Sequence, residues 1–290
     1  MKKIAVIGTP DGWSSERLAD AVAEKTNFRL LIDMQEVYLD CAKQTVFYNG
    51  LDLRSLDAII VKKISTEYSL EYTERFHHLI FLKKMGLKVF SDPEKILNCY
   101  DRMSGTLTLR AGNIPMPETV ITENLESAVE ALEKFEIAVF KPLYSTKARG
   151  MKMISVKDEH YKSAIRRFSE ENPTMYIQKK IEIPGHDLGV AFIGGQYLAT
   201  YARVSSGKSW NTTIYSGGKY SAYQPSQEII DLAHKAQALF GLDFTSVDVV
   251  ETTEGPMVFE VSAFGGFRGL YEANGIDAAR LYVDYVLKNL

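Results

Sequence analysis

The stretch SVDVVETTEGPMVFEVS, residues 246–262, places one carboxylate inside each of two apolar runs that are separated by the turn dipeptide Glu254-Gly255. This pattern predicts a β-hairpin with Asp248 and Glu260 on paired strands. Buried carboxylates are costly when unpaired, and two close together repel each other. A magnesium ion would relieve both costs, because Mg²⁺ takes one or two carboxylates together with phosphate and water oxygens. Ser262 lies two residues beyond Glu260 on the same strand face and offers a third oxygen. A half-exposed hairpin with solvated acids is the alternative.

A basic segment upstream offers the opposite charge. Lys141 follows the apolar run Ile137 to Phe140 and precedes Pro142, which ends the predicted strand. The connector Ser145 to Gly150 then supplies hydroxyls, backbone amides and cations, which together can hold phosphate oxygens. It is neither a Walker sequence nor a dinucleotide fingerprint, so a plain surface turn is the alternative.

A third candidate segment lies between these two. Residues 175–181 form an apolar strand that turns polar before Pro184-Gly185, and a chain crossing between two lobes there exposes backbone groups suited to the edge of an adenine ring. Asp187 follows at a distance suited to a ribose hydroxyl or a basic partner. Arg203 ends the strand that leaves the Gly194-Gly195 turn. For each of these two residues, the alternative is a surface ion pair.

Composition excludes several classes of protein. The 290 residues are 46% hydrophobic and 24% charged, which is typical of a globular chain large enough for two lobes or more. A net charge of −3 is too balanced for bulk binding to nucleic acid or an anionic membrane. We find no signal peptide or membrane span, which predicts a cytoplasmic protein. Cys41 and Cys99 lack metal-ligand spacing and are interpreted as reduced thiols.

The pattern of elements predicts an α/β part followed by an α+β part. Residues 1–92 alternate strand and helix signals, which favours a small open sheet of mostly parallel strands. A helix is predicted from Pro93 through to about Ala111. Hairpins interleaved with helices follow, with turns at Gly194-Gly195 and Glu254-Gly255 and helices over about 225–240 and 277–288.

The order of these features resembles the ATP-grasp superfamily, and within it the RimK-like α-L-glutamate ligases. The resemblance extends over essentially the whole chain, beginning with Asp101-Arg102 and ending with Glu260-Val261-Ser262. It implies an ATP-grasp fold: a preATP-grasp α/β domain (1–92), a small lobe with the phosphate loop (93–181) and a lobe with the metal site (182–290). It further implies these contacts: Arg102, Lys141, Ser145 and Gly150 for phosphates; Gln178, Lys179 and Ile181 for adenine; Asp187 and Thr213 for the nucleotide; and Asp248, Glu260 and Ser262 for magnesium or manganese, with two ions expected.

Several positions depart from the family pattern. Gly189 stands where the family often has arginine, Ser262 where it has asparagine, and residues 213–218 lack the usual cation. Arg268, between Gly266-Phe267 and Gly269, is a candidate replacement that would contact a substrate carboxylate, with a surface salt bridge as the alternative. Trp210 is a candidate acceptor contact or a packed loop anchor.

The implied reaction is ATP-dependent amide formation through an acyl phosphate. The cations and the metal offset the charge of the phosphates, and Arg203 stabilises the tetrahedral oxyanion. The expected partners are small-molecule carboxylate and amine substrates, with glutamate added to a cofactor precursor. The alternatives are the same ligation on a peptide or protein terminus, and a non-catalytic ATP-binding regulator. A homo-oligomer, dimer or tetramer, is compatible with the sequence.

Overall fold

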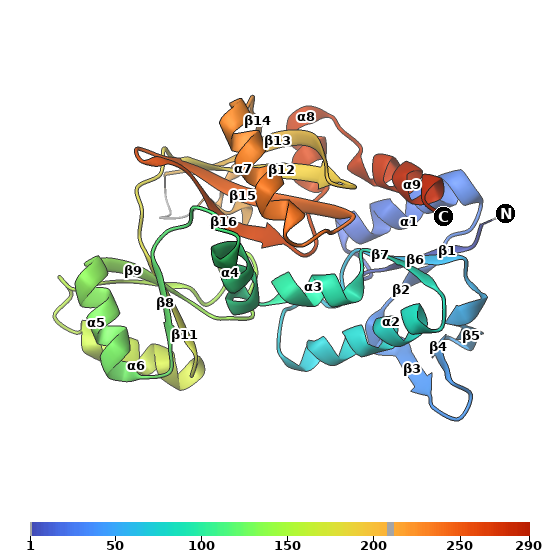
Figure 1. Ribbon diagram of the computed structural model, residues 1–290, viewed down its shortest axis with the longest axis horizontal. Helices are drawn as coiled ribbons and strands as arrows, with labels where there is room; N and C mark the ends of the chain where they lie inside the picture. Colours follow the sequence, from blue (N-terminus) through green and yellow to red (C-terminus); the bar gives the residue numbers. More distant parts are fainter. Residues whose placement is uncertain (1, 208–211) are drawn as a thin grey trace.

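The computed structural model describes residues 2–207 and 212–290. The molecule is elongated, with the N-terminal sheet at one end and helices α5 and α6 at the other (Figure 1). The long antiparallel strands β12 to β16 lie between these ends. Mixed α/β and α+β architecture is therefore confirmed.

The N-terminal sheet is parallel throughout, as the alternating pattern predicts. Its strands lie in the order β2 (Leu31–Ile32), β1 (Ile4–Ile7), β6 (Ala58–Val61) and β7 (Lys88–Phe90). Alternate strand residues face opposite ways, so one set packs with α1 (Trp13–Thr26) and the other with α2 (Glu74–Lys84). A hairpin that turns at Asn49-Gly50 belongs to a separate small sheet of β3 (Val37–Asp40), β4 (Thr45–Tyr48) and β5 (Leu51–Asp52). Short 3₁₀ helices are η1 (Met34–Glu36), η2 (Leu53–Ser55), η3 (Glu71–Thr73) and η4 (Ile214–Ser216).

The single helix predicted from Pro93 to Ala111 is wrong, because the chain forms two helices there. These are α3 (Pro93–Tyr100) and α4 (Arg102–Ala111), and Asp101 between them is extended, with φ −108° and ψ 159°. The Asp101 carboxylate accepts a hydrogen bond from the Ser104 amide at 2.9 Å and so caps α4. The break makes Arg102 the first residue of a new helix.

A four-stranded antiparallel sheet follows, in the order β10 (Lys152–Ser155), β9 (Ile137–Lys141), β11 (Met175–Lys179) and β8 (Thr119–Thr122). Helices α5 (Leu125–Phe135) and α6 (Tyr161–Glu171) cover one face, on which Phe140 and Ile177 are fully buried. Because side chains alternate along a strand, Lys141 and Gln178 lie on the opposite face. Strand β8 and helix α5 are not among the predicted elements.

The last sheet is antiparallel with the order β14 (Lys219–Ala222), β13 (Gln196–Val204), β12 (His186–Ile193), β15 (Phe244–Thr252) and β16 (Gly255–Ser262). Both predicted hairpins, at Gly194-Gly195 and Glu254-Gly255, are confirmed. Helix α7 (Gln227–Ala238) packs on one face through Ile229, Ala233 and Ala236, and the short helix α8 (Arg268–Asn274) contacts β13 and β14.

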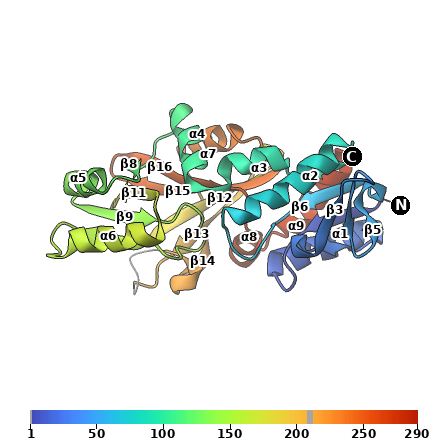
Figure 2. The same cartoon turned by 90° about the horizontal axis from the view of Figure 1, so that it is seen from below.

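The C-terminal helix returns to the first sheet. Figures 1 and 2 both show α9 (Ala278–Lys288) beside α1, and Lys25 pairs with Asp284 at 2.7 Å across this contact. In the part of the chain that the structure describes, no helix combines the length and apolar character that a membrane span needs.

Candidate functional site

Asp248 and Glu260 face each other across the hairpin, as the sequence predicts. Their Cα atoms are paired in the register of β15 and β16, and Ser246 pairs with Ser262 in the same ladder. The register then shifts, since Val249 pairs with Val258 and leaves Phe259 as the extra residue. The Phe259 ring lies under Lys141, with its centroid 5.6 Å from Nζ. The hairpin thus brings both acids and the predicted phosphate-binding lysine to one place.

Asp248 is a buried carboxylate with one unsatisfied oxygen. Its Oδ2 lies 2.8 Å from Arg203 Nη2, whereas Oδ1 is buried without a hydrogen-bond partner. Burial raises the pKa of Asp248 to about 7, against the opposing effect of the Arg203 charge. An oxygen that is buried and unpartnered fits the coordination shell of a hard cation.

The donor set also fits magnesium. Across residues 2–207 and 212–290, no group of three His, Cys, Asp or Glu side chains could hold a metal alone. Two carboxylates with Ser262 nearby leave coordination positions for phosphate and water oxygens, which is how Mg²⁺ is commonly bound beside a nucleotide.

Arg203 is held between two acids. It pairs with Asp248 and also makes a two-pronged contact with Asp187, whose Oδ1 and Oδ2 lie 3.2 and 3.1 Å from Nε. Thr212 Oγ1 donates a further bond to Asp187 Oδ1 at 2.5 Å. Asp187 is 5% exposed, so of the two alternatives predicted for it, the structure contains the basic partner. The two acids raise the pKa of the Arg203 guanidinium despite its burial, which fixes its positive charge beside Asp187 and Asp248.

Arg102 anchors the start of the predicted phosphate loop. Its Nε donates to Pro142 O at 3.0 Å, and its Nη2 donates to Ser145 O and Oγ at 3.0 and 3.1 Å. Its Nη1 pairs with Glu260 Oε2 at 2.9 Å. The first turn of α4, the loop and strand β16 are therefore tied together by one side chain.

Lys141 lies in a polar but carboxylate-poor environment. Its Nζ donates to Gln178 Oε1 at 2.5 Å and lies 5.8 Å from the Tyr176 ring centroid. Burial, followed by the nearby charge of Arg102, lowers the pKa of Lys141 to about 7. Gln178 is 2% exposed and its amide also donates to Thr119 Oγ1, which fixes the orientation of the acceptor that faces Lys141. A desolvated lysine that lacks a carboxylate partner is suited to bind phosphate.

Other predicted residues lie away from this arrangement. The Lys179 side chain is 45% exposed and pairs with Glu118 at 3.2 Å, and its contact with adenine stays a prediction. Arg268 is exposed and pairs with Glu272 one helical turn along α8, which is the surface salt bridge given as its alternative.

The remaining candidates occupy connecting segments. Ile181 O accepts from Lys180 Nζ, Gly150 has a positive φ of 70°, and Thr213 Oγ1 donates to Ser216 Oγ. Trp210 lies outside the described residues.

Three further residues complete the site without having been predicted. Tyr176 pairs directly with Lys141 in the ladder, and its hydroxyl contacts Thr106 Oγ1 at 2.9 Å. Tyr176 lies two residues before Gln178, so both side chains lie on the same face of β11. This alternation could have predicted Tyr176 as a site residue. Thr212 and Tyr201 give no comparable signal, because their contacts with β12 join residues that are distant in the sequence.

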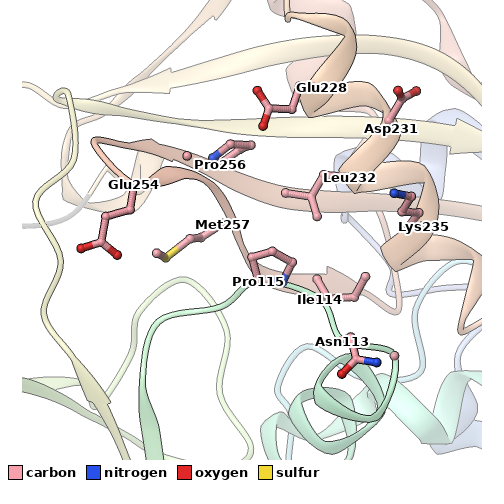
Figure 3. A pocket seen from close by; sticks show the side chains of 12 residues that line it. Asn113, Ile114, Pro115, Glu228, Asp231, Leu232, Lys235, Glu254, Pro256 and Met257 are labelled. Atoms are coloured by element: carbon pink, nitrogen blue, oxygen red, sulfur yellow. The ribbon is translucent and has the colours of Figure 1, made fainter.

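A hollow lies elsewhere on the molecule. Figure 3 shows it between the end of α4, helix α7 and the β15–β16 turn, with a volume of about 800 Å³ and with Ile114, Leu232 and Met257 among its lining residues. None of the predicted site residues lines it. The carboxylates and cations described above therefore define a different site.

Comparison with known proteins agrees with this geometry. Residues 100–286 match the model of the RimK-like ATP-grasp domain. The chain is 27% identical to the tetrahydromethanopterin:α-L-glutamate ligase of Methanosarcina acetivorans, with 99% of both chains covered. It is 24% identical to a probable α-L-glutamate ligase of Shewanella halifaxensis, covering 99% of this chain and 63% of that one.

Solved structures share the fold. The ATP-grasp ligase PsnB in complex with a minimal precursor superimposes with a TM-score of 0.77 at 20% identity, covering 100% of this chain and 99% of that chain. A RimK domain ATP-grasp protein from Sphaerobacter thermophilus gives a TM-score of 0.77 at 19% identity, with 98% of both chains covered.

Proposed function

Because the chain belongs to the RimK-like ATP-grasp family, we propose that it joins a carboxylate to an amine at the expense of ATP, and that glutamate is the amino acid added to a small-molecule acceptor. The observation that carries this proposal is the pairing of Asp248 with Glu260 opposite Lys141 and Arg102. That arrangement offers acids for a metal and cations for phosphates on facing walls.

The proposed division of the chain follows its sheets. Residues 1–92 hold the parallel sheet, residues 93–181 supply the phosphate loop and Lys141, and residues 182–290 supply Arg203 and the acids. ATP would lie between the second and third segments.

Asp248, Glu260 and Ser262 would hold Mg²⁺, with two ions expected and Mn²⁺ as an alternative. The metal would neutralise phosphate charge and so ease attack by a carboxylate on the γ-phosphorus. Lys141 and Arg102 would hold phosphate oxygens, and Gln178 would keep the Lys141 ammonium directed at them. The charge of Arg203, whose side chain is 18% exposed, would stabilise the oxyanion formed when the amine attacks the acyl phosphate. Excluding water by closing residues 145–150 would protect that intermediate.

A peptide acceptor is the second candidate. PsnB was also solved with a precursor peptide. The macrocyclase MdnC of Microcystis aeruginosa, which has a TM-score of 0.72 at 15% identity, was solved with one too. These likenesses concern the fold, so the small-molecule acceptor stays the first choice.

The test is a product assay. Purified protein is incubated with ATP, Mg²⁺, pooled amino acids and small carboxylates, and mass spectrometry is used to search for new amides. We expect an amide mass that requires ATP and is accompanied by ADP. ADP formation without any amide in the pool, followed by amide formation with peptide acceptors, would favour the second candidate. Nucleotide binding without turnover under either condition would contradict both.

A further inference from the structure

Two acids hold Arg203, and they hold different atoms of its guanidinium. Nε donates to both carboxylate oxygens of Asp187, and Nη2 donates to Oδ2 of the same residue. Asp248 pairs with Arg203 through Nη2 and Oδ2, at 2.8 Å. Among the residues that the structure describes, these are the only two carboxylates that pair with Arg203. The bond to Nε therefore depends on Asp187, whereas Asp248 shares Nη2 with it.

The strand register explains this difference. Asp187 is directly opposite Arg203 in the β12–β13 ladder, so the two side chains are cross-strand neighbours. Asp248 belongs to the next strand, β15, where it pairs with Gly189 of β12. Arg203 must reach across β12 to meet it. Asp187 is therefore the local partner of Arg203, and Asp248 is the distant one.

The carboxylate of Asp187 is fully occupied by the protein itself. Besides the three bonds from Arg203, it accepts one from Thr212 Oγ1 at 2.5 Å. A carboxylate has about four acceptor positions in all. The Asp187 side chain is 7% exposed, and Thr212 is buried beside it. This environment leaves little capacity for a ribose hydroxyl and favours a role that acts through Arg203.

Asp248 has a second task that competes with its contact to Arg203. It is a proposed metal ligand, and its Oδ1 is buried without a hydrogen-bond partner. Once Asp248 shared its charge with a divalent ion, Arg203 would lie beside a second cation and be repelled by it. A guanidinium stays in place under such repulsion when another carboxylate holds it through a two-pronged contact. Asp187 makes that contact and is not among the proposed metal ligands.

We propose that Asp187, itself held by Thr212, is a positioning residue that keeps the Arg203 guanidinium at the reaction centre when Asp248 binds the metal. The proposal rests on the proposed function, in which Arg203 stabilises the oxyanion. It gives Asp187 a role different from the nucleotide contact that the family resemblance implies.

The chain contains a matched control for this arrangement. Asp52 accepts bonds from Nε and Nη2 of Arg54 and, at 2.5 Å, from Thr45 Oγ1. This second group is more exposed, and it belongs to the small sheet of β3 to β5 at the N-terminal end of the molecule (Figure 1). Asp52→Asn thus removes the same kinds of bond at a distance from the proposed site.

The first experiment follows the Nε–H proton of Arg203 by nuclear magnetic resonance. Exchange of arginine Nε–H protons with water is measured in ¹⁵N-labelled full-length protein, both free and saturated with Mg²⁺ and AMPPNP, and Arg203→Lys identifies the signal. We expect slow exchange in the wild type under both conditions. Asp187→Asn should accelerate exchange at least ten-fold. Asp248→Asn in the free protein and Asp52→Asn should both leave the signal slow, because neither removes the acceptor of Nε.

The second experiment separates positioning from nucleotide binding. Asp187→Asn should lower kcat at least ten-fold and change KM for ATP by less than about three-fold, because an interaction needed in the transition state is lost and ATP binding is not. Asp52→Asn should change neither constant.

Two results would overturn the proposal. One is unchanged exchange of the Arg203 Nε–H in Asp187→Asn. The other is a higher KM for ATP with kcat intact, which would make Asp187 a nucleotide contact. If Asp187→Asn does not fold, Thr212→Val replaces it, with Thr45→Val as its control. At least three-fold faster exchange in Thr212→Val alone is then expected, and equal exchange rates in Thr212→Val and the wild type would overturn the proposal. The resonance measurement needs no amide product, so its failure is distinguishable from failure of the proposed ligation.

Discussion

Arg102 and Glu260 form an ion pair, with Nη1 2.9 Å from Oε2, that connects the first turn of α4 to strand β16. The proposed phosphate contact is thus bound to a proposed metal ligand. The Glu260 side chain is 48% exposed, and ion pairs of that kind contribute at most about 1 kcal/mol. Phosphate and metal could therefore replace both partners at low cost.

Replacing Glu260 with Gln should abolish Mg²⁺-dependent turnover while changing stability little. The amide retains the shape but loses the charge that a divalent ion needs, and only an exposed ion pair is lost. ADP release at several Mg²⁺ concentrations measures the first effect, and urea unfolding measures the second. The matched control is Glu254→Gln at the hairpin turn, where the side chain is exposed. Normal turnover by Glu260→Gln would show that the metal is held elsewhere.

Replacing Lys141 with Ala should weaken ATP binding by roughly 1–3 kcal/mol, the usual cost of losing a charge-assisted contact. Calorimetric titration with ATP and Mg²⁺ measures the change. Lys134→Ala is the control, because that lysine is 66% exposed and pairs with Glu118. Equal affinities of Lys141→Ala and the wild type would remove Lys141 from the phosphate site.

ATP affinity should fall as the pH rises above 7. Burial lowers the pKa of Lys141 to about 7 in the free protein, so at pH 8 most molecules hold it neutral. Phosphate binding favours the charged form, and each molecule must then take up a proton. Between pH 8 and 9 this linkage should weaken binding by up to about ten-fold, since one proton is required per site. Calorimetry in two buffers of different ionisation enthalpy would detect the uptake, and Lys141→Met should show none.

Much of the site could be predicted because it depends on local patterns. The alternation of residues 246–262 is enough to place Asp248 and Glu260 on paired strands, whereas the bulge that sets them directly opposite each other is not visible in it. The apolar run before Pro142 is enough to place Lys141 at the end of a strand. The parallel character of the first sheet follows in the same way from alternating strands and helices.

Other features depend on contacts that a sequence pattern does not carry. The sequence around Asp101 has a continuous helical pattern. The helix nevertheless breaks there, and the Asp101 side chain caps the new helix α4. Helix α8 is short, and its close approach to β13 depends on Gly269, where a Cβ atom would lie 2.6 Å from Tyr201 Cε2. The pairing of Arg203 with both Asp187 and Asp248 requires three strands to assemble in one register. Lys179 lies on the same face of β11 as Ile177, the face that α5 and α6 cover, so its side chain points away from Lys141 and Gln178.

The departure at Gly189 has a steric cause that a double substitution can test. A Cβ atom built on Gly189 would lie 2.4 Å from Tyr201 Cζ, and one on Gly269 would lie 2.6 Å from Tyr201 Cε2. The Tyr201 ring, which is 4% exposed, fills the space beside Gly189 where a larger side chain would otherwise lie. Gly189→Ala should therefore destabilise the fold by about 1–3 kcal/mol through overpacking.

Gly189→Arg, which introduces the residue that the family often has at this position, should be more destabilising still. Tyr201→Ala alone should also destabilise, because it leaves a cavity. The double variant should lose less free energy of unfolding than the sum of the losses of the two single variants, because the arginine side chain occupies the space of the lost ring. Urea unfolding of the four proteins measures this coupling. Additive losses would mean that the Tyr201 ring and the side chain at position 189 do not compete for one space.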